Sequence, residues 1–193
     1  MYVRDAKNRE EVWLLDRIEE MGLDETSFRS RDYVIAIDED SGEKAGFGRR
    51  RVHKTDENRV CEVTSIGVVE EWRNQGVGAH VLERLVQHAA DDDFETLYAL
   101  SDRPEYLAQF GFESIAEGDL PAPLADRLTE KRESIQPDAV PLALAIDQFS
   151  VPTDHREAFK AAEPDREESA PETSPEEFGI DPEEATYKYD TGD

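Results

Sequence analysis

Three short apolar segments separated by polar turns occupy the first third of the chain. Residues 32–38, 44–53 and 59–69 have the composition of β-strands, and the turn sequences DEDSGE and KTDEN stand between them. Strands joined by such tight turns pair with their neighbours in the sequence in antiparallel order. The pattern therefore predicts an antiparallel meander of three strands.

Helical periodicity appears on both sides of this meander. Before it, a short strand is expected at 2–6, and Val12, Leu15 and Ile18 recur at helical spacing before Gly22. After it, the apolar residues from Gly76 onward fall on one helical face: Val77, Val81, Leu82, Leu85, Val86 and Ala89. We expect this second helix to pack on the sheet.

The remaining pattern completes one α/β domain over residues 1–147, with a mixed, largely antiparallel central sheet flanked by helices. Pro141 in the last strand requires an edge position or the start of a strand. The further elements expected are a strand at 95–101, a short helix at 104–110, a strand from 111, a helix at 121–133 and a final strand at 139–147.

Residues 148–193 lose this periodicity and are rich in Pro, Glu, Ser and Asp. Such a segment cannot bury enough apolar surface to offset its conformational entropy. We therefore expect an acidic, disordered or loosely docked tail that the chemistry does not need.

The chain is strongly acidic, with 47 Asp and Glu against 22 Lys and Arg and a formal net charge of −25. Such a surface repels nucleic acid and anionic membranes, so we expect neither as a partner. Residues 1–147 alone carry 33 acidic and 18 basic side chains, so the excess is not confined to the tail. This distribution favours a halophilic protein over a mesophilic domain with an acidic tail.

Cys61 is the single cysteine, which excludes an internal disulfide. The sequence has neither an apolar run long enough to span a bilayer nor the apolar centre of a signal peptide, and we expect a cytoplasmic location. The spacing of His, Cys, Asp and Glu fits no metal site, so no metal is expected.

The segment RNQGVG opens the second helix, and a glycine-rich turn at a helix N-terminus suits a phosphate or pyrophosphate group. The triphosphate loop is excluded because Lys and Ser/Thr are missing after Gly78, and the dinucleotide loop fits poorly. The third pattern, R/Q-x-x-G-x-G/A, matches, with an ordinary turn as the alternative. The residues that we expect to bind the cofactor here are Arg73, Asn74, Gln75, Gly76, Val77, Gly78 and Ala79.

At this point the chain resembles the GNAT superfamily of acyl-CoA-dependent N-acetyltransferases. PEYLAQFGF (104–112) is similar to the family's second motif, and DLPAPLADRL and AVPLALAID are similar to its N-acetylglutamate synthase-like branch. The resemblance implies the GNAT fold, acetyl-CoA as cosubstrate, and its pyrophosphate on the glycine loop. It also implies that the third strand of the meander splays near SIGVV, freeing backbone groups of Ile66 and Val68 for the pantetheine arm.

Acetyl transfer to an amine needs a proton acceptor and a proton source for the departing thiolate. Glu62 is the candidate base, because strand alternation places it on one face with Thr64 and Ile66; a solvated strand carboxylate is the alternative. Leu107 stands where many family members carry a tyrosine acid. Tyr106 beside it is the candidate acid, with a packing role as the alternative.

These features predict an N-acetyltransferase that acts on a primary amine of a small metabolite such as an amino acid. Two alternatives stay open: a protein or peptide N-acetyltransferase, and an acetyl-CoA-binding sensor without turnover, motivated by the missing tyrosine. The sequence also leaves open whether the protein forms a homodimer.

The charge of the chain predicts that salt stabilises the fold. Because dissolved ions screen repulsion between carboxylates, the melting temperature should rise between about 0.1 M and several molar KCl. Thermal unfolding across that range measures the effect. A flat or falling melting temperature would contradict the halophilic interpretation.

Overall fold

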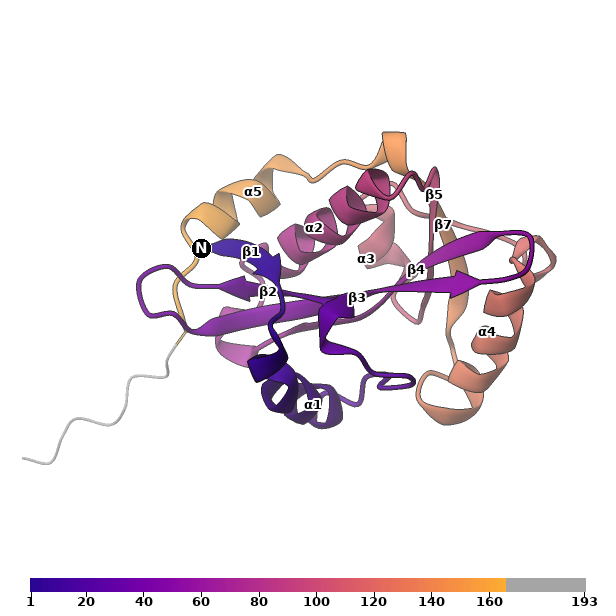
Figure 1. The fold of residues 1–193 in the computed structure, drawn as a ribbon. Helices are drawn as coiled ribbons and strands as arrows, with labels where there is room; N and C mark the ends of the chain where they lie inside the picture. Colours follow the sequence, from indigo (N-terminus) through magenta and orange to yellow (C-terminus); the bar gives the residue numbers. More distant parts are fainter. Residues whose placement is uncertain (166–193) are drawn as a thin grey trace, which may run out of the picture.

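The computed structural model describes residues 1–165, and residues 166–193 lie outside the described part (Figure 1). Its strands are β1 (Tyr2–Asp5), β2 (Tyr33–Ile37), β3 (Lys44–Lys54), β4 (Arg59–Val68), β5 (Thr96–Ser101), β6 (Glu113–Ser114) and β7 (Val140–Ala145). Its α-helices are α1 (Glu11–Glu20), α2 (Val77–Asp91), α3 (Pro104–Ala108), α4 (Ala122–Ser134) and α5 (Thr153–Lys160).

The strands form a single sheet in the order β1-β2-β3-β4-β5-β7-β6. All neighbours pair antiparallel except β4 and β5, which are parallel. The predicted meander is confirmed as β2-β3-β4, and Pro141 is the second residue of β7, close to the strand start that its missing N–H requires. The observed sheet is the mixed, largely antiparallel one that the sequence predicts.

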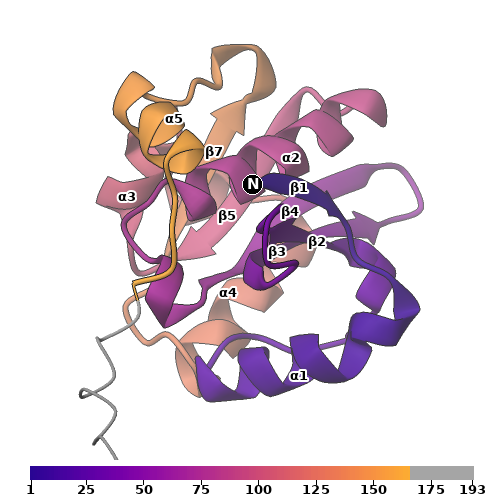
Figure 2. The same cartoon turned by 90° about the vertical axis from the view of Figure 1, so that its left-hand side faces the viewer.

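Helices cover both faces of this sheet. Helices α2 and α5 lie side by side over one face, and α1 and α4 lie on the other (Figures 1 and 2). The six apolar residues predicted to form one face of α2 are all buried, and they pack against residues of β2, β3, β4 and β5. Burial of this stripe is the main apolar contact of the fold.

Helix α1 buries a different stripe from the one predicted. Val12 is 70% exposed, whereas Leu14 and Ile18 are fully buried and Met21 packs beside them. Spacings of four and three residues keep these side chains on one narrow face, which meets Phe47 of β3. The predicted apolar face through Val12, Leu15 and Ile18 is therefore wrong. The buried face runs through Leu14, Ile18 and Met21.

The C-terminal segment is ordered further than predicted. Helix α5 lies within the expected tail, and its Phe159 is 9% exposed and stacks on His80 of α2 with ring centroids 3.8 Å apart. The boundary at residue 147 and the disorder from residue 148 are therefore corrected for residues 148–165. One buried aromatic residue, with Val151 before it, anchors a segment whose average composition is polar.

Two irregularities in β4 open the sheet at its centre. Phe47 pairs with Gly67 and Arg49 with Thr64, so Gly48 alone faces both Ser65 and Ile66, and Ser65 has the left-handed φ of 50°. This is a β-bulge, which bends the strand that carries the extra residue. On the other side, β4 pairs with β5 only from Cys61 to Val63. Beyond Val63 the two strands separate.

Within residues 1–165, no helix is long and apolar enough to cross a membrane.

Candidate active site

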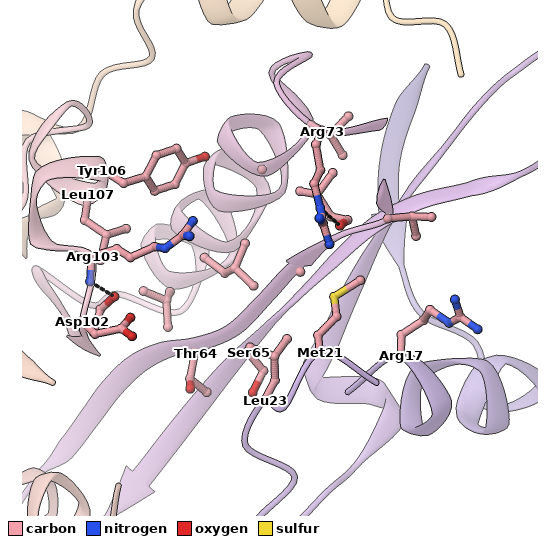
Figure 3. A pocket seen from close by; sticks show the side chains of 18 of the residues that line it. Arg17, Met21, Leu23, Thr64, Ser65, Arg73, Asp102, Arg103, Tyr106 and Leu107 are labelled. Carbon is pink, nitrogen blue, oxygen red and sulfur yellow. Dashed lines mark hydrogen bonds between the residues drawn. The ribbon is translucent and has the colours of Figure 1, made fainter. Parts of the chain in front are cut away.

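A cleft of about 980 Å³ occupies the gap between the diverging ends of β4 and β5. The end of α1, the loop before α2, and helices α3 and α4 complete its walls. In Figure 3, Tyr106 points its hydroxyl into the cleft toward the side that carries Arg73, and Thr64, Ser65 and Leu23 lie across from them. The cleft thus joins the glycine loop to the centre of the sheet.

The glycine loop has an unusual backbone. Asn74 and Gly76 both have positive φ, 60° and 74°, and Gly76 caps the N-terminus of α2. The backbone N–H of His80 donates to the Gly76 carbonyl at 3.2 Å, and this is the first hydrogen bond of the helix. The amides of the first turn before it have no helical partner and carry the positive end of the helix dipole. This arrangement suits a phosphate group.

The backbone of β4 faces the cleft in the way the resemblance implies. Val69 donates its N–H to Ala45 of β3, so by alternation the polar groups of Ile66 and Val68 face away from β3. Arg73 Nε donates to the Val68 carbonyl at 3.3 Å, which confirms that this carbonyl points to the loop side. Neither residue has a pairing partner on β5.

Most of the predicted cofactor residues line this cleft: Ile66, Val68, Arg73, Asn74, Gly76, Val77 and Gly78. Ala79 is fully buried in the main core and lies outside the lining. Gln75 also lies outside it, because its side chain binds the C-terminal segment. Most residues of the loop therefore line the cleft, whereas Gln75 binds the C-terminal segment.

The segment after α5 holds the glycine loop by backbone hydrogen bonds. Gln75 Nε2 donates to the Glu163 carbonyl at 2.8 Å, and Gln75 Oε1 accepts from the Glu163 N–H at 2.9 Å. The N–H of Asp165 donates to the Glu71 carbonyl at 2.7 Å. Helix α5 itself packs so closely on Gly76 that a Cβ there would lie 2.1 Å from the His155 carbonyl oxygen.

Tyr106 of α3 lines the cleft beside the first turn of α2. Its hydroxyl oxygen is 2.8 Å from the position that a Cβ would occupy at Gly78, so the absence of a side chain there makes room for the ring. Burial raises the pKa of Tyr106 above its ordinary value of 10.0, which keeps the phenol protonated at neutral pH. A protonated hydroxyl in the cleft can donate a hydrogen bond.

Glu62 does not face the cleft, and its predicted position on one face with Ile66 is wrong. The bulge at Ser65 interrupts the alternation, so Ile66 packs with the α2 core while Glu62 meets Arg127 of α4 on the other face. Glu62 is fully buried, and its two oxygens bind His53 Nε2 at 2.8 Å and Arg127 Nη2 at 3.3 Å. This placement gives no support to Glu62 as a base that contacts the amine.

Burial opposes the charge on Glu62, yet its pKa is lowered. The hydrogen bond from His53 and the positive charges of Arg127 and Lys131 together outweigh the cost of desolvation. A carboxylate with a lowered pKa is a weak base. Glu62 therefore holds Arg127 in place in this structure.

Asp24 is a buried carboxylate that lines the cleft, and the sequence analysis missed it. Glu20, Glu70, Glu71 and Asp102 also line this cleft. Its carboxylate binds the Arg127 guanidinium and accepts a hydrogen bond from the Thr26 N–H at 2.9 Å. Ser65 Oγ donates to its backbone carbonyl at 2.7 Å. Burial raises the pKa of Asp24, but the bonds to Thr26 and the charge of Arg127 bring it down to about 2.

Lys131 of α4 also lines this end of the cleft and was not predicted. It is 6% exposed, and Nζ donates to the Leu100 carbonyl at the end of β5 at 2.6 Å. Burial lowers its pKa from the ordinary 10.5. No sequence motif marks Asp24 or Lys131; only the packing of α4 against the α1–β2 loop brings them to one cleft. Among residues 1–165, no group of three His, Cys, Asp or Glu side chains could hold a metal ion.

The fold and this cleft define an α/β domain in which a helix N-terminus and an open strand edge meet at one site. The chain belongs to the acetyltransferase (GNAT) family, whose model matches residues 2–112. This membership confirms the predicted family, and the fold is the one that the family resemblance implies. No curated protein sequence is significantly similar to this chain.

Solved structures with the same fold include the N-acetylglutamate synthase of Neisseria gonorrhoeae in complex with coenzyme A and N-acetyl-glutamate. It is 19% identical, with a TM-score of 0.60, and the match covers 75% of this chain and 34% of that chain. This chain therefore spans about a third of that enzyme's length. Rv2747 of Mycobacterium tuberculosis, in complex with CoA and NLQ, is 17% identical with a TM-score of 0.61, covering 75% and 99%. At these identities the likeness shows the fold.

The contacts of the C-terminal segment predict that it supports the glycine loop. A chain ending after Phe149 loses the cover on Gly76 and the two hydrogen bonds between Gln75 and Glu163. Its affinity for coenzyme A should therefore fall at least about tenfold, which is about 1.4 kcal/mol. A chain ending after Asp165 keeps these contacts and is the matched control. Calorimetric titration of both chains with coenzyme A makes the comparison; equal affinities would refute the supporting role.

The buried pair of Asp24 and Arg127 predicts an acid-dependent loss of stability. Because the folded pKa of Asp24 is below the ordinary 3.8, its contribution is complete above that pH and disappears as the pH falls through about 2. Asp24→Asn should cost about 3 kcal/mol at pH 7, and the difference from the parent should shrink between pH 4 and 2. Thermal unfolding across this range checks it, with Asp16→Asn as an exposed control; a deficit independent of pH would contradict the assignment.

Proposed function

We propose that this protein transfers the acetyl group of acetyl-CoA to a primary amine of a small molecule such as an amino acid. The observation that carries this proposal is the separation of β4 from β5 beyond Val63, which leaves one continuous cleft between the glycine loop and Asp24. One end of this cleft has the chemistry for a pyrophosphate, and the other has charged side chains for a polar acceptor.

The cofactor half is assigned from backbone groups. The pyrophosphate would bind the amides at the start of α2, around Gly76 and Gly78, and Arg73 would add a positive charge beside it. The pantetheine arm would run along the backbone of Ile66 and Val68, whose polar groups have no partner on β5. This route ends with the thioester near Tyr106.

The acceptor half is assigned from charge and enclosure. Asp24, with its pKa of about 2, is ionised at neutral pH and attracts the ammonium group of an incoming amine. Lys131 and Arg103 line the same cleft and offer N–H donors to a carboxylate. Opposite charges within one cleft favour an acceptor with both an amino and a carboxyl group. Walls formed by α1 and α4 favour a small molecule over an extended peptide.

The chemistry requires a neutral amine, attack on the thioester carbon, and stabilisation of the departing thiolate. Tyr106 is the residue that we propose for the last step. With its raised pKa it donates a hydrogen bond to the sulfur as negative charge develops, while the amine proton leaves through water in the cleft. Glu62 acts as a positioning residue, because it holds the Arg127 that binds Asp24.

The test measures thiol release from acetyl-CoA by the full chain against a panel of amino acids, polyamines and short peptides. Turnover with amino acids supports the proposal. Turnover with peptides alone would show that the acceptor is a peptide and not a small molecule. Binding of acetyl-CoA without turnover for any acceptor would favour the sensor alternative.

Tyr106→Phe tests the assigned proton donor. This change removes only the hydroxyl, so kcat should fall by about 10²-fold while coenzyme A affinity stays within about twofold. Tyr98→Phe, on β5 and outside the residues that line the cleft, is the matched control. A Tyr106→Phe enzyme with kcat within about threefold of the parent would remove this hydroxyl from the mechanism.

A further inference from the structure

A second, smaller pocket of about 290 Å³ lies where β3 extends beyond its partner β2. Pairing between these strands ends with Tyr33 opposite Arg49, so residues 50–54 have no partner on that side of β3. The residues that line the pocket come from the segment before β2, from β3 and from α2: Ser27, Arg29, Arg31, Asp32, Arg49, Arg50, Arg51, Val52, His53, Lys54 and His88.

The charge of this pocket is opposite to that of the chain. Five arginines and one lysine line it, with Asp32 as the only carboxylate in the lining, in a protein of net charge −25. Arg50 is paired with Asp92 at 2.6 Å, and Arg49 is paired with Asp32 at 3.4 Å. Arg29, Arg31 and Lys54 make no ion pair within the part of the chain that the structure describes. An unneutralised group of cations here exerts mutual repulsion.

Two guanidinium groups in the pocket have buried N–H donors without a partner. Arg49 is 1% exposed and binds the carbonyls of Thr26 and Ser27, but its Nε has no acceptor within the described residues. Arg51 Nη1 is likewise buried without an acceptor there. An unsatisfied buried donor is unfavourable, and more so on a charged group. An anionic ligand in the pocket would offset the positive charge of these guanidinium groups.

We propose that this pocket is a second ligand site, which binds a small molecule carrying two or more anionic oxygen groups of the phosphate or carboxylate kind. Guanidinium groups recognise such oxygens through paired hydrogen bonds, and several cations around one small volume select a multiply charged ligand. Its volume admits a small metabolite.

The site is separate from the acetyl-CoA cleft. None of its lining residues lines the cleft, and the buried chain of His53, Glu62, Arg127 and Asp24 stands between the two. Arg49 also connects them, since it binds the carbonyls of Thr26 and Ser27, two and three residues after Asp24. The ligand would therefore bind behind the acceptor end of the cleft.

The test titrates the full chain with pyrophosphate and with citrate by calorimetry, at about 0.2 M KCl and with saturating coenzyme A, which occupies the glycine loop. One anion bound per chain is expected. In Arg29→Gln/Arg31→Gln, which removes two exposed cations from the rim, affinity should fall at least about tenfold while the melting temperature stays near the parent value. Lys7→Gln/Arg9→Gln removes the same charge from exposed positions outside the pocket and should bind as the parent does.

Preference for pyrophosphate over citrate would indicate a phosphorylated ligand, and the reverse a polycarboxylate. If neither anion binds, or if the two double variants bind equally, the proposal is wrong. If coenzyme A itself does not bind, the titration is made on the free chain. Weaker anion binding by Arg29→Gln/Arg31→Gln than by Lys7→Gln/Arg9→Gln then supports the second site, and equal binding contradicts it.

Discussion

The separation of β4 from β5 is the feature on which the site depends. A parallel pair would normally continue to satisfy the backbone groups of both strands, but here pairing ends at Val63 and the bulge at Ser65 bends β4 away. A non-glycine residue at positive φ costs about 1–3 kcal/mol. The hydrogen bond from Ser65 Oγ to the Asp24 carbonyl helps to hold this conformation and fixes the loop that carries Asp24.

A buried charge cluster ties helix α4 and the loop between α1 and β2 to that strand. Arg127 of α4 binds both Asp24 and Glu62, and Glu62 also binds His53. A buried ion pair contributes little net stability, but loss of one partner leaves an uncompensated charge. The cluster therefore matters mainly for geometry: it sets where α4 lies, and with it the position of Lys131 in the cleft.

The other sheet face supports the cofactor half. Helix α2 begins at the glycine loop, and its apolar stripe fixes it to the sheet. Helix α5 packs along α2 (Figure 2). The His155 carbonyl of α5 lies against Gly76, and Glu163 after the helix binds Gln75. A loop held in one conformation by such contacts loses less conformational entropy when a ligand binds.

The sequence by itself determined the meander, the apolar stripe of α2 and the glycine loop, because alternation, helical period and turn chemistry are local properties of neighbouring residues. The single-residue insertion at Ser65 left no such local signal, so alternation placed Glu62 on the wrong face relative to Ile66. Asp24 and Arg127 are 103 residues apart, and Glu163, in the segment after α5, binds Gln75, 88 residues before it. Only tertiary packing decided these contacts, since no periodicity records which distant side chains meet.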